Sequence, residues 1–266
     1  MNIEHENNKK AWEEVFEHRR EDFGMDIIRR CQQESFPFLQ PEFVKVISQY
    51  DLKGKKIAHF CCNNGRELMS LMQLEPSYAV GVDIAQNMID FANEIANTLS
   101  YNCEFVQSDI LAIQPKYNDT FDAVIITIGA LTWFKDLQAF FQVVKRVLKE
   151  DGVVLLSESH PFTNMLAMPN EDGYVESQPD LLVNSYFKDD PWIEQGGIDY
   201  IADSNNKFVH TFTSYSHTLS SIFNSMISSG FSIQLFNEYE KDLTDSFEDV
   251  SNSGFPLSYV LVAQNK

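Results

Sequence analysis

Hydrophobic positions follow two alternating patterns from about residue 40 onward. Short apolar runs are typical of buried strands, and the segments between them carry apolar residues at helical spacing. One such segment is 85–99, whose apolar side consists of Met88, Ile89, Ile95 and Leu99. The run FDAVIITIG at 121–129 is continuous, as expected of a central parallel strand that is covered on both faces.

The two patterns predict alternating strands and helices over most of the chain. The predicted strands are 56–60, 78–83, 103–109, 121–129, 151–159, 232–240 and 256–264. The predicted helices are 41–50, 65–74, 85–99, 137–149 and 217–231. The last helix has Thr218 or Ser220 as its N-cap and Gly230 as its stop. Because helices of this length join parallel strands by right-handed crossovers, the sequence predicts an α/β fold with a doubly wound, mostly parallel sheet.

The alternation breaks after residue 159. Residues 160–197 are rich in proline, asparagine, aspartate and aromatic residues, and they show no sustained period. We interpret 160–216 as an insertion over one end of the sheet, with short strands near 198–215. Its aromatic residues are expected to cover a ligand pocket, and they are Phe162, Tyr174, Tyr186, Phe187 and Trp192.

Composition and charge argue against several classes of protein. The chain has 266 residues, of which 44% are hydrophobic, and this is enough for a full core. A net charge of −19 repels phosphate backbones and argues against general binding of nucleic acids or anionic membranes. No apolar run approaches the roughly 18 residues that span a bilayer, and the polar N-terminus lacks the core of a signal peptide. We therefore expect a cytoplasmic protein.

The cysteines give little indication of a metal or redox site. Cys31, Cys61, Cys62 and Cys103 occur without a C-x-x-C pair and without histidines at zinc spacing. Adjacent cysteines such as Cys61 and Cys62 form a disulfide only with strain. We therefore interpret all of them as small buried residues and expect no metal.

The ends of the first strands carry chemically informative residues. Ligands of open α/β sheets bind beyond the carboxyl ends of the strands, near the point where the strand order reverses. After the first strand comes CCNNG at 61–65, a turn in which Gly65 lets the backbone approach a ligand and the following helix offers free N–H groups. Asp83 ends the second strand, where a carboxylate can accept both hydroxyl protons of a ribose or cap the next helix.

Asp109, in the sequence QSDI, ends the third strand and discriminates between two classes of cofactor. A dinucleotide dehydrogenase uses a G-x-G-x-x-G turn, which this sequence lacks, and has no general need for an acid on strand three. An adenosine joined to an amino acid does need one, because the acid can bind the adenine amino group while Ile110 packs on the ring. An NAD(P)-dependent oxidoreductase is therefore disfavoured, although Asp109 could also be a turn or cap residue.

Together, these stretches resemble class I S-adenosylmethionine-dependent methyltransferases. The matching motifs, in order, are the glycine-containing first turn, GVD at 81–83, SD at 108–109, FDAVIITIGAL at 121–131 and VLKEDGVVLLSE at 147–158. More narrowly, HFCCNNGRE, SHPF and YSHTLSSIFNSMISSGF resemble a bacterial subgroup of small-molecule methyltransferases with a His-x-x-Cys type first motif. The resemblance implies a seven-stranded Rossmann-like sheet with an antiparallel last strand and an insertion after strand five.

The resemblance also implies S-adenosylmethionine as the cofactor and S-adenosylhomocysteine as the product. The implied cofactor-binding residues are Phe60, Cys61, Cys62, Asn63, Gly65, Asp83, Ile84, Met88, Ser108, Asp109, Ile110, Thr127, Ile128 and Gly129. The sequence departs from the family at His59, where most members have an acid, and at Cys61 and Asn63, which replace the first two glycines. These two side chains should narrow the room for the methionine end of the cofactor.

Methyl transfer from a sulfonium needs mainly alignment and exclusion of water, and it needs a base only where the acceptor must lose a proton. His160, directly after the fifth strand, is the candidate base, or else a turn residue that hydrogen bonds hold before Pro161. Tyr186, Trp192 and His217 are the candidate substrate contacts, and His217 could equally be a cap residue at the start of its helix.

The expected domains are an N-terminal helical lid (1–40), a cofactor-binding core (41–159), the substrate-side insertion (160–216) and a C-terminal completion of the core (217–266). We expect a small-molecule acceptor, no nucleic-acid or membrane partner, and a monomer or homodimer. The alternative is a methyltransferase-like binding or regulatory protein without turnover, which the glycine-poor first turn would allow. Retention of Asp83, Asp109 and Gly129 favours an intact cofactor site.

Overall fold

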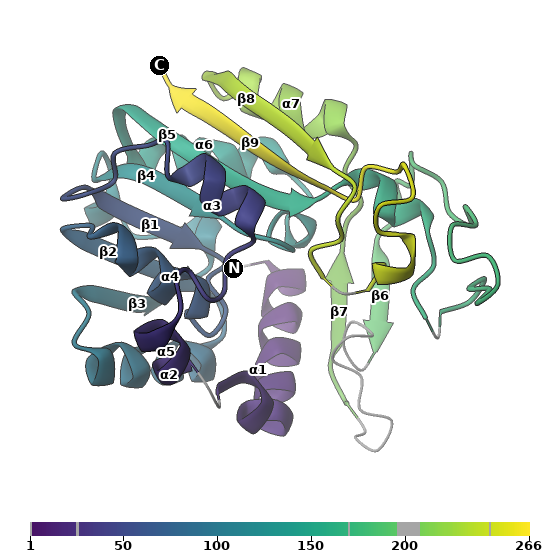
Figure 1. Ribbon diagram of the computed structural model, residues 1–266, viewed down its shortest axis with the longest axis horizontal. Helices are drawn as coiled ribbons and strands as arrows, with labels where there is room; N and C mark the ends of the chain where they lie inside the picture. Colours follow the sequence, from purple (N-terminus) through teal and green to yellow (C-terminus); the bar gives the residue numbers. More distant parts are fainter. Residues whose placement is uncertain (1, 25–26, 170, 196–207, 245) are drawn as a thin grey trace.

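The structure, a computed structural model, describes residues 2–24, 27–169, 171–195, 208–244 and 246–266, and its centre is a seven-stranded sheet (Figure 1). In sheet order, the strands are β3 (Cys103–Gln107), β2 (Tyr78–Asp83), β1 (Lys56–Phe60), β4 (Phe121–Ile126), β5 (Leu148–Ser159), β9 (Ser258–Asn265) and β8 (Phe231–Tyr239). The α-helices are α1 (Ile3–Gly24), α2 (Ile27–Gln33), α3 (Pro41–Ile47), α4 (Arg66–Leu71), α5 (Gln86–Leu99), α6 (Leu137–Val147) and α7 (Leu219–Ser228).

The pairing of the strands confirms the predicted fold class. Strands β1 to β5 pair in parallel, and β9 is antiparallel to both β5 and β8. The strand order reverses between β1 and β4, which is the place where a doubly wound sheet binds its ligand. The last strand is antiparallel, and the insertion follows β5, as the resemblance implied.

Alternate residues of the central strands belong to two separate cores, because successive side chains of a strand point to opposite faces. In β4, Ala123 and Ile125 pack in the core that includes α1 to α5, whereas Val124 and Ile126 pack in the core that includes α6 and α7. All four side chains are fully buried. This burial on both faces explains the unbroken apolar run in the sequence.

The helix ends follow from local chemistry. Thr218 is the N-cap of α7, and its hydroxyl accepts the Ser221 N–H at 3.1 Å, so the first of the two predicted caps is the one used. Gly230, with a φ of 88°, follows the end of this helix, as predicted. In α6 the Asp136 side chain accepts the Ala139 N–H at 2.9 Å.

The boundary between α6 and β5 differs from the prediction. The helix ends at Val147 instead of 149, and the strand begins at Leu148 instead of 151. Leu148 pairs with Phe121, and the register then shifts before Val153 pairs with Ala123. The predicted turn around Gly152 is therefore an irregularity inside the strand, and such a bulge has no distinct hydrophobic pattern.

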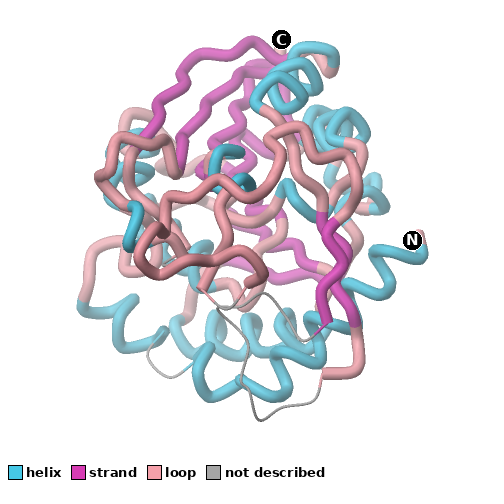
Figure 2. The backbone as a smooth tube through the Cα atoms, turned by 90° about the vertical axis from the view of Figure 1, so that its right-hand side faces the viewer, coloured by secondary structure: helices cyan, strands magenta, loops and turns pink. Residues whose placement is uncertain are grey.

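The insertion begins with a 3₁₀ helix, Pro161–Met165, and contains a two-stranded antiparallel hairpin of β6 (Trp192–Gln195) and β7 (Thr211–Ser214). The strand β7 lies within the predicted range, whereas β6 precedes it, and residues 196–207 lie outside the described residues. Figure 2 looks onto this side of the molecule, where the loops of the insertion lie in front of the sheet.

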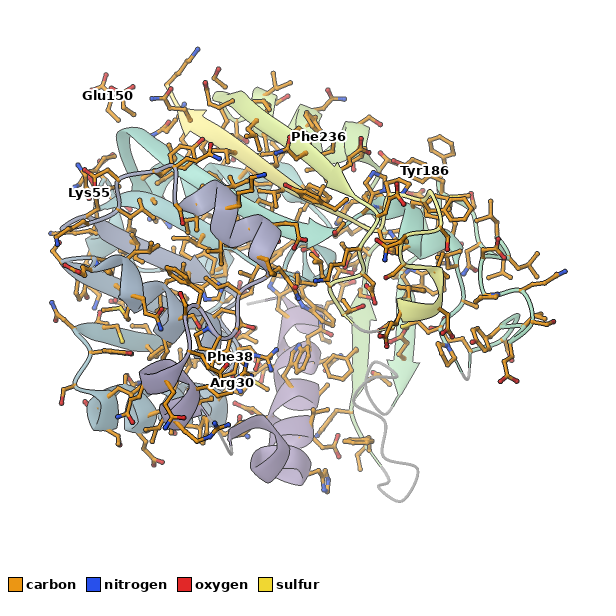
Figure 3. The ribbon with its side chains drawn as sticks, in the orientation of Figure 1. Arg30, Phe38, Lys55, Glu150, Tyr186 and Phe236 are labelled. Atoms are coloured by element: carbon orange, nitrogen blue, oxygen red, sulfur yellow. The ribbon has the colours of Figure 1, made fainter. Side chains whose placement is uncertain are left out.

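The insertion covers the side of the sheet on which the parallel strands end. Figure 3 shows Tyr186 of the insertion at the opposite end of the molecule from Lys55 and Glu150, which lie near the amino ends of the central strands. The carboxyl ends of the parallel strands therefore face the insertion and α1. Within the described ranges, no helix combines the length and the apolar character needed to cross a membrane.

The contact between Gly81 and Phe105 gives a test of the packing between β2 and β3. A Cβ at Gly81 would overlap the Phe105 ring and would lie 2.9 Å from Sγ of Cys62. We expect Gly81→Ala to lower the free energy of unfolding by about 1–3 kcal/mol, because overpacking forces neighbours out of their rotamers. Guanidinium unfolding of the variant and the parent measures this loss.

A double-mutant cycle separates this overlap from other effects of the substitution. In a Phe105→Ala background both clashing ring atoms are removed, so Gly81→Ala should cost at least about 1 kcal/mol less there. An equal cost in both backgrounds would show that Phe105 is not the cause.

Candidate active site

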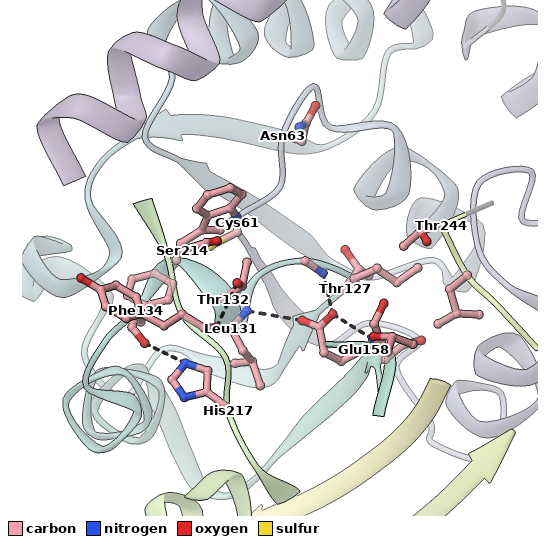
Figure 4. A pocket seen from close by; sticks show the side chains of 18 of the residues that line it. Cys61, Asn63, Thr127, Leu131, Thr132, Phe134, Glu158, Ser214, His217 and Thr244 are labelled. Carbon is pink, nitrogen blue, oxygen red and sulfur yellow. Dashed lines mark hydrogen bonds between the residues drawn. The ribbon is translucent and has the colours of Figure 1, made fainter. Parts of the chain in front are cut away.

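A cavity of about 800 Å³ lies at the carboxyl ends of the parallel strands. The ends of β1 to β5 form its floor. The helix α1, the start of α3 with the segment before it, the insertion with its β6–β7 hairpin, and the loop after β8 contribute to the other walls. The volume falls in the range of roughly 300–1,000 Å³ that is typical of ligand sites. Figure 4 shows Cys61, Thr127 and Glu158 among the side chains that surround it.

The loop after β1 has a backbone conformation that normally requires glycine. The φ angle is 55° at Cys61, 50° at Asn63 and 82° at Gly65. The left-handed region costs an ordinary residue roughly 1–2 kcal/mol, and asparagine tolerates it better than cysteine does. The chain thus has the shape of a glycine-rich loop with one glycine in it, and backbone strain of this kind concentrates at functional sites.

Two glycines of the site have different surroundings. A Cβ at Gly65 would lie 2.5 Å from the Phe105 ring. The glycine therefore lets the loop backbone pack closely against the protein core, and this contact does not involve the cavity. Gly129, after β4, has a φ of 82° and lines the cavity, and a Cβ there would meet nothing within 4 Å. The space beside Gly129 is therefore part of the cavity.

Asp83, the last residue of β2, holds the loop after β1 in place. Its Oδ2 accepts the Asn63 N–H at 2.8 Å, and its Oδ1 accepts the Ala85 N–H at 3.0 Å. Burial raises the pKa of this carboxyl, and the backbone N–H groups oppose the shift. A carboxylate has about four acceptor positions, so Asp83 retains acceptor capacity toward the cavity that it lines.

Asp109 lies beyond the end of β3 and contacts α1. Its Oδ1 accepts the Leu111 N–H at 3.0 Å, and its Oδ2 lies 2.9 Å from Nδ1 of His5. Burial would raise the pKa of Asp109, but His5 and the Leu111 N–H hold it below its ordinary value. The two side chains of this pair are buried, so His5 closes the cavity beside Asp109.

The helix α1 is also joined to the hairpin. The Asn8 side chain donates to the Thr213 carbonyl and accepts the Thr213 N–H, both at 2.8 Å. Trp12 packs edge-on against Trp133 and Phe212, with ring centroids 5.5 and 5.0 Å apart. The helix therefore bridges the two sides of the cavity.

Glu158, near the end of β5, is a buried carboxylate with four backbone donors. Its Oε1 accepts the N–H groups of Gly129 at 2.6 Å and Ser159 at 2.9 Å. Its Oε2 accepts those of Ala130 at 3.1 Å and Leu131 at 3.3 Å (Figure 4). Burial nevertheless raises its pKa to about 6. With its acceptor positions filled, Glu158 fixes the loop after β4.

The model of the methyltransferase domain family matches residues 51–197, which is more than half of the chain. The chain belongs to this family. The fold is that of class I methyltransferases, the enzymes that use S-adenosylmethionine as methyl donor. The narrower bacterial subgroup is not distinguished by this match.

Solved structures share the fold of this methyltransferase at low identity. An S-adenosylmethionine-dependent methyltransferase from Mesorhizobium loti has a TM-score of 0.64 at 19% identity, covering 85% of this chain and 96% of that one. One from Clostridium acetobutylicum has a TM-score of 0.62 at 14% identity, covering 94% and 97%. A curated relative, the tRNA U34 carboxymethyltransferase of Campylobacter lari, is 31% identical over 111 residues. The match spans 40% of this chain and only 36% of that relative's length.

Most of the predicted cofactor residues meet at the cavity of the methyltransferase. Those that line it are Cys61, Asn63, Asp83, Ile84, Ser108, Asp109, Ile110, Thr127, Ile128 and Gly129. Those that do not line it are Phe60, Cys62, Gly65 and Met88. The side chains of Phe60, Cys62 and Met88 are fully buried in the cores beneath the loop.

His160 lines the cavity, but one nitrogen of its ring is hydrogen-bonded to a main-chain N–H. Its Nδ1 accepts the Phe162 N–H at 3.0 Å and so caps the 3₁₀ helix Pro161–Met165. The proton of the neutral ring is then on Nε2, which lies 3.1 Å from Oε1 of Glu238. Burial lowers the pKa of His160, and Glu238 opposes the shift. The role of His160 as a base stays a prediction.

The predicted substrate contacts fall in different places. Trp192 and His217 line the cavity, and Tyr186 does not. His217 donates from Nε2 to the Phe134 carbonyl at 3.0 Å, and burial lowers its pKa (Figure 4). The Tyr186 hydroxyl accepts the Leu219 N–H at 3.0 Å, at the start of α7. Of the other aromatic residues of the insertion, Phe162 stacks on Phe255, and Phe187 is 77% exposed.

His59 is the residue of β1 at which a departure from the family pattern was expected. Its ring is fully buried, and burial lowers its pKa to about 4, so it is neutral. Its Nε2 lies 2.9 Å from the Thr127 hydroxyl, which joins β1 to the end of β4. A neutral ring thus ties together two strands at the cavity floor.

The two cysteines of the loop are not activated thiols. Burial raises the pKa of both Cys61 and Cys62 well above the ordinary value, and the charge of Asp83 adds to the shift. Among the described residues, no group of three or more His, Cys, Asp or Glu side chains is arranged to hold a metal.

Several residues of the cavity were absent from the sequence-based prediction. They include His5, Asn8, Glu158, Glu194 and Tyr215. Glu158 carried a signal, since it comes two residues after the apolar run of a central strand and so lies near the carboxyl end of that strand. The residues of α1 carried none, because their contacts join positions far apart in the chain.

The raised pKa of Glu158 predicts a pH-dependent contribution to stability. The folded state binds this proton with a pKa of about 6 against an ordinary value of 4.5, so stability is gained as the pH falls through this range. Relative to Glu158→Gln, which cannot titrate, the parent should gain about 1 kcal/mol between pH 7.5 and pH 5. Urea unfolding of both proteins at the two pH values measures the difference.

Glu150→Gln, at the exposed other end of β5, is the control for the loss of one acidic side chain from this strand. A constant difference between the parent and Glu158→Gln at both pH values would contradict the assignment.

Proposed function

We propose that this methyltransferase transfers the methyl group of S-adenosylmethionine to a small-molecule acceptor. The observation that carries the proposal is the loop after β1, which adopts the glycine-type backbone at Cys61, Asn63 and Gly65. The Asp83 side chain accepts the main-chain N–H of Asn63 in this loop, and Asp83 also lines the cavity. A turn in this conformation beside a strand-two acid fits a nucleoside with an amino-acid tail.

The residues around the cavity fit the parts of the cofactor. We propose that Asp83 accepts the ribose hydroxyls and that Asp109, with Ile110, binds the adenine ring. Thr127, Ile128 and Gly129 would lie beside the sulfur end, where the absence of a Cβ at Gly129 leaves open space. When bound, the sulfonium supplies an activated methyl group that an in-line nucleophile displaces.

The contribution of the chain itself is alignment and the exclusion of water. Glu158 fixes the loop at Gly129 through its hydrogen bonds, and the buried pair of His5 and Asp109 closes the adenine end. The neutral His59 holds the Thr127 hydroxyl, so no charged imidazole opposes a sulfonium. Such positioning is worth several orders of magnitude in rate when it holds the reacting atoms in line.

A small molecule is favoured over a nucleic acid as the acceptor. The Campylobacter relative is named for an activity on tRNA, but the match to this chain covers 36% of that protein. This chain has a net charge of −19, which opposes the approach of a phosphate backbone. The helix α1 and the hairpin also meet over the cavity, through Asn8 and Thr213, and so narrow the way in.

We further propose that α1 acts as the lid of the site. It contributes His5, Asn8 and Trp12 to the cavity wall. It also contacts the core, where the Glu13 side chain accepts the Gln86 N–H at 2.9 Å, and the segment before β7, where the Glu14 carboxylate accepts the Val209 N–H at 2.9 Å. A helix that contacts both the core and the hairpin has to move, at least in part, when a ligand as large as the cofactor enters.

Cofactor binding and the role of Asp83 are tested together by calorimetry. The parent should bind S-adenosylmethionine and S-adenosylhomocysteine one-to-one with micromolar affinity. Asp83→Asn should weaken binding of S-adenosylhomocysteine at least tenfold, because hydrogen bonds to a charged group are worth about 1.5–3 kcal/mol.

Asp90→Asn, on the exposed side of α5, is the matched control and should bind as the parent does. Equal affinity of the two variants would mean that Asp83 does not contact the cofactor. If the parent itself does not bind, the proposed function is wrong.

A further inference from the structure

His59 and Thr127 form a buried hydrogen bond at the floor of the cavity. The His59 Nε2 lies 2.9 Å from the Thr127 hydroxyl oxygen, and the histidine ring is fully buried. Burial lowers the pKa of His59 to about 4, and the charge of Glu67 opposes this shift only in part, so the ring carries a single proton. That proton is on Nε2 or on Nδ1, and its place decides which way the Thr127 proton points.

The surroundings of the ring favour the proton on Nε2. The Nδ1 atom of His59 is buried and has no hydrogen-bond partner among the described residues. A proton on Nδ1 would therefore be a buried donor without an acceptor, and such donors are rarer in proteins than unpaired acceptors. With the proton on Nε2, His59 donates to the Thr127 oxygen. The Thr127 proton is then available to a ligand in the cavity that Thr127 lines.

Ser157 provides a second hydroxyl beside Thr127. Ile126 and Leu156 pair across β4 and β5, and Thr127 and Ser157 are the next residues of these chains, so they lie about one strand spacing, roughly 4.8 Å, apart. Ser157 is only 3% exposed and lines the cavity, yet its hydroxyl has no hydrogen-bond partner in the part of the chain that the structure describes. Because a buried hydroxyl is costly without a partner, Ser157 indicates a polar ligand group at this place.

The Ser157 hydroxyl points away from the buried Glu158. Leu155 packs in the core that includes α1 to α5, so Ser157 points to that face of the sheet, whereas Glu158 points to the other. Phe38 and Phe43, which also line the cavity, pack against or within the same core. The two hydroxyls are therefore neutral donors with apolar side chains near them, and no carboxylate of β5 competes for their protons.

We propose that Thr127 and Ser157 donate hydrogen bonds to the carboxylate of the amino-acid tail of S-adenosylmethionine, and that His59 is the positioning residue that turns the Thr127 proton toward it. The inference rests on the proposed binding of this cofactor in the cavity. Thr127 lies at the proposed sulfur end, and the tail is joined to the sulfur. Two hydroxyl protons one strand spacing apart match a group with two acceptor oxygens, and hydrogen bonds to a charged acceptor are the stronger ones.

Arg66 is the other residue that could bind this carboxylate. Among the described residues that line the cavity, it is the only lysine or arginine. Its Nε lies 2.9 Å from Oε1 of Glu67, so an acid already shares its charge. Variants of Arg66 and of Thr127 separate the two assignments.

Two ligands that differ only by the carboxylate test the proposal. S-adenosylhomocysteine has this group, and S-adenosyl-3-thiopropylamine has the same adenosine, sulfur and amine without it. Calorimetry measures the affinity of the parent, Thr127→Val and Ser157→Ala for both ligands. Thr127→Val should weaken binding of S-adenosylhomocysteine at least tenfold and change that of the amine less than about twofold, because only the carboxylate accepts the lost hydrogen bond. Ser157→Ala should show the same selectivity.

Thr120→Val, at the amino end of the same strand, is the matched control and should change neither affinity. An undiminished preference for S-adenosylhomocysteine in Thr127→Val would overturn the proposal. A selective loss in Arg66→Gln alone would assign the carboxylate to Arg66 and would overturn it as well. If the parent binds S-adenosylhomocysteine and the variants keep its preference, only this inference fails. If the parent does not bind, the proposed function fails and this inference fails with it.

A double-mutant cycle tests whether His59 acts through Thr127. His59→Leu should cause a selective loss of affinity for S-adenosylhomocysteine in the parent and no further selective loss in the Thr127→Val background. His59→Gln should keep most of the affinity, because the glutamine amide can donate from the position of Nε2. A selective loss of equal size in both backgrounds would show that His59 does not position Thr127.

The place of the His59 proton is measurable in the unaltered protein. Long-range proton–nitrogen correlation spectra of the isotope-labelled parent show which ring nitrogen of each histidine carries the proton, and the signals absent from His59→Gln belong to His59. We expect the proton on Nε2 at neutral pH. A proton on Nδ1 would mean that Thr127 donates to the ring and presents only lone pairs to the cavity, which would overturn the proposal.

Discussion

The hydrogen bonding of buried carboxylates by main-chain N–H groups is the constraint on which the site depends. A buried charge is costly unless hydrogen bonds satisfy it. Glu158 meets this requirement with four N–H groups, three of them from the loop after β4. Asp83 meets it with N–H groups from the loops after β1 and β2. The hydrogen bonds to these two carboxylates therefore help to fix the shape of the loops.

This constraint explains how the loop after β1 holds a glycine-type backbone with other residues in it. Strained backbone persists where the surroundings over-determine it. The Asn63 N–H is bound by Asp83, and His59, at the preceding strand, is bound to Thr127. The hydrogen bond from the Asn63 N–H to the buried Asp83 offsets part of the cost at Cys61 and Asn63. The number of glycines in the motif is thus a poor guide to the backbone conformation of the loop, because Cys61 and Asn63 adopt left-handed φ angles as Gly65 does.

The sequence predicted the central strands well and the walls of the cavity poorly, for a physical reason. The bounds of β1 and β2 match the predicted ranges because an apolar run reports burial directly. The same holds for the acids Asp83 and Asp109, whose place follows from the strand ends. In contrast, His5 meets Asp109 over a separation of 104 residues, and Asn8 meets Thr213 over 205. Contacts over such separations leave no periodic signal in either segment.

The contacts of α1 have a consequence for both ends of the cavity. His5 contacts Asp109 beyond the end of β3, and Asn8 binds the backbone of the β6–β7 hairpin at Thr213. These two residues lie three apart on one helix, so they share a face and move together. A displacement of this helical turn that separates His5 from Asp109 also breaks the hydrogen bonds between Asn8 and β7. One helix therefore holds both the wall beside Asp109 and the wall formed by the hairpin, and a movement of this helix changes both.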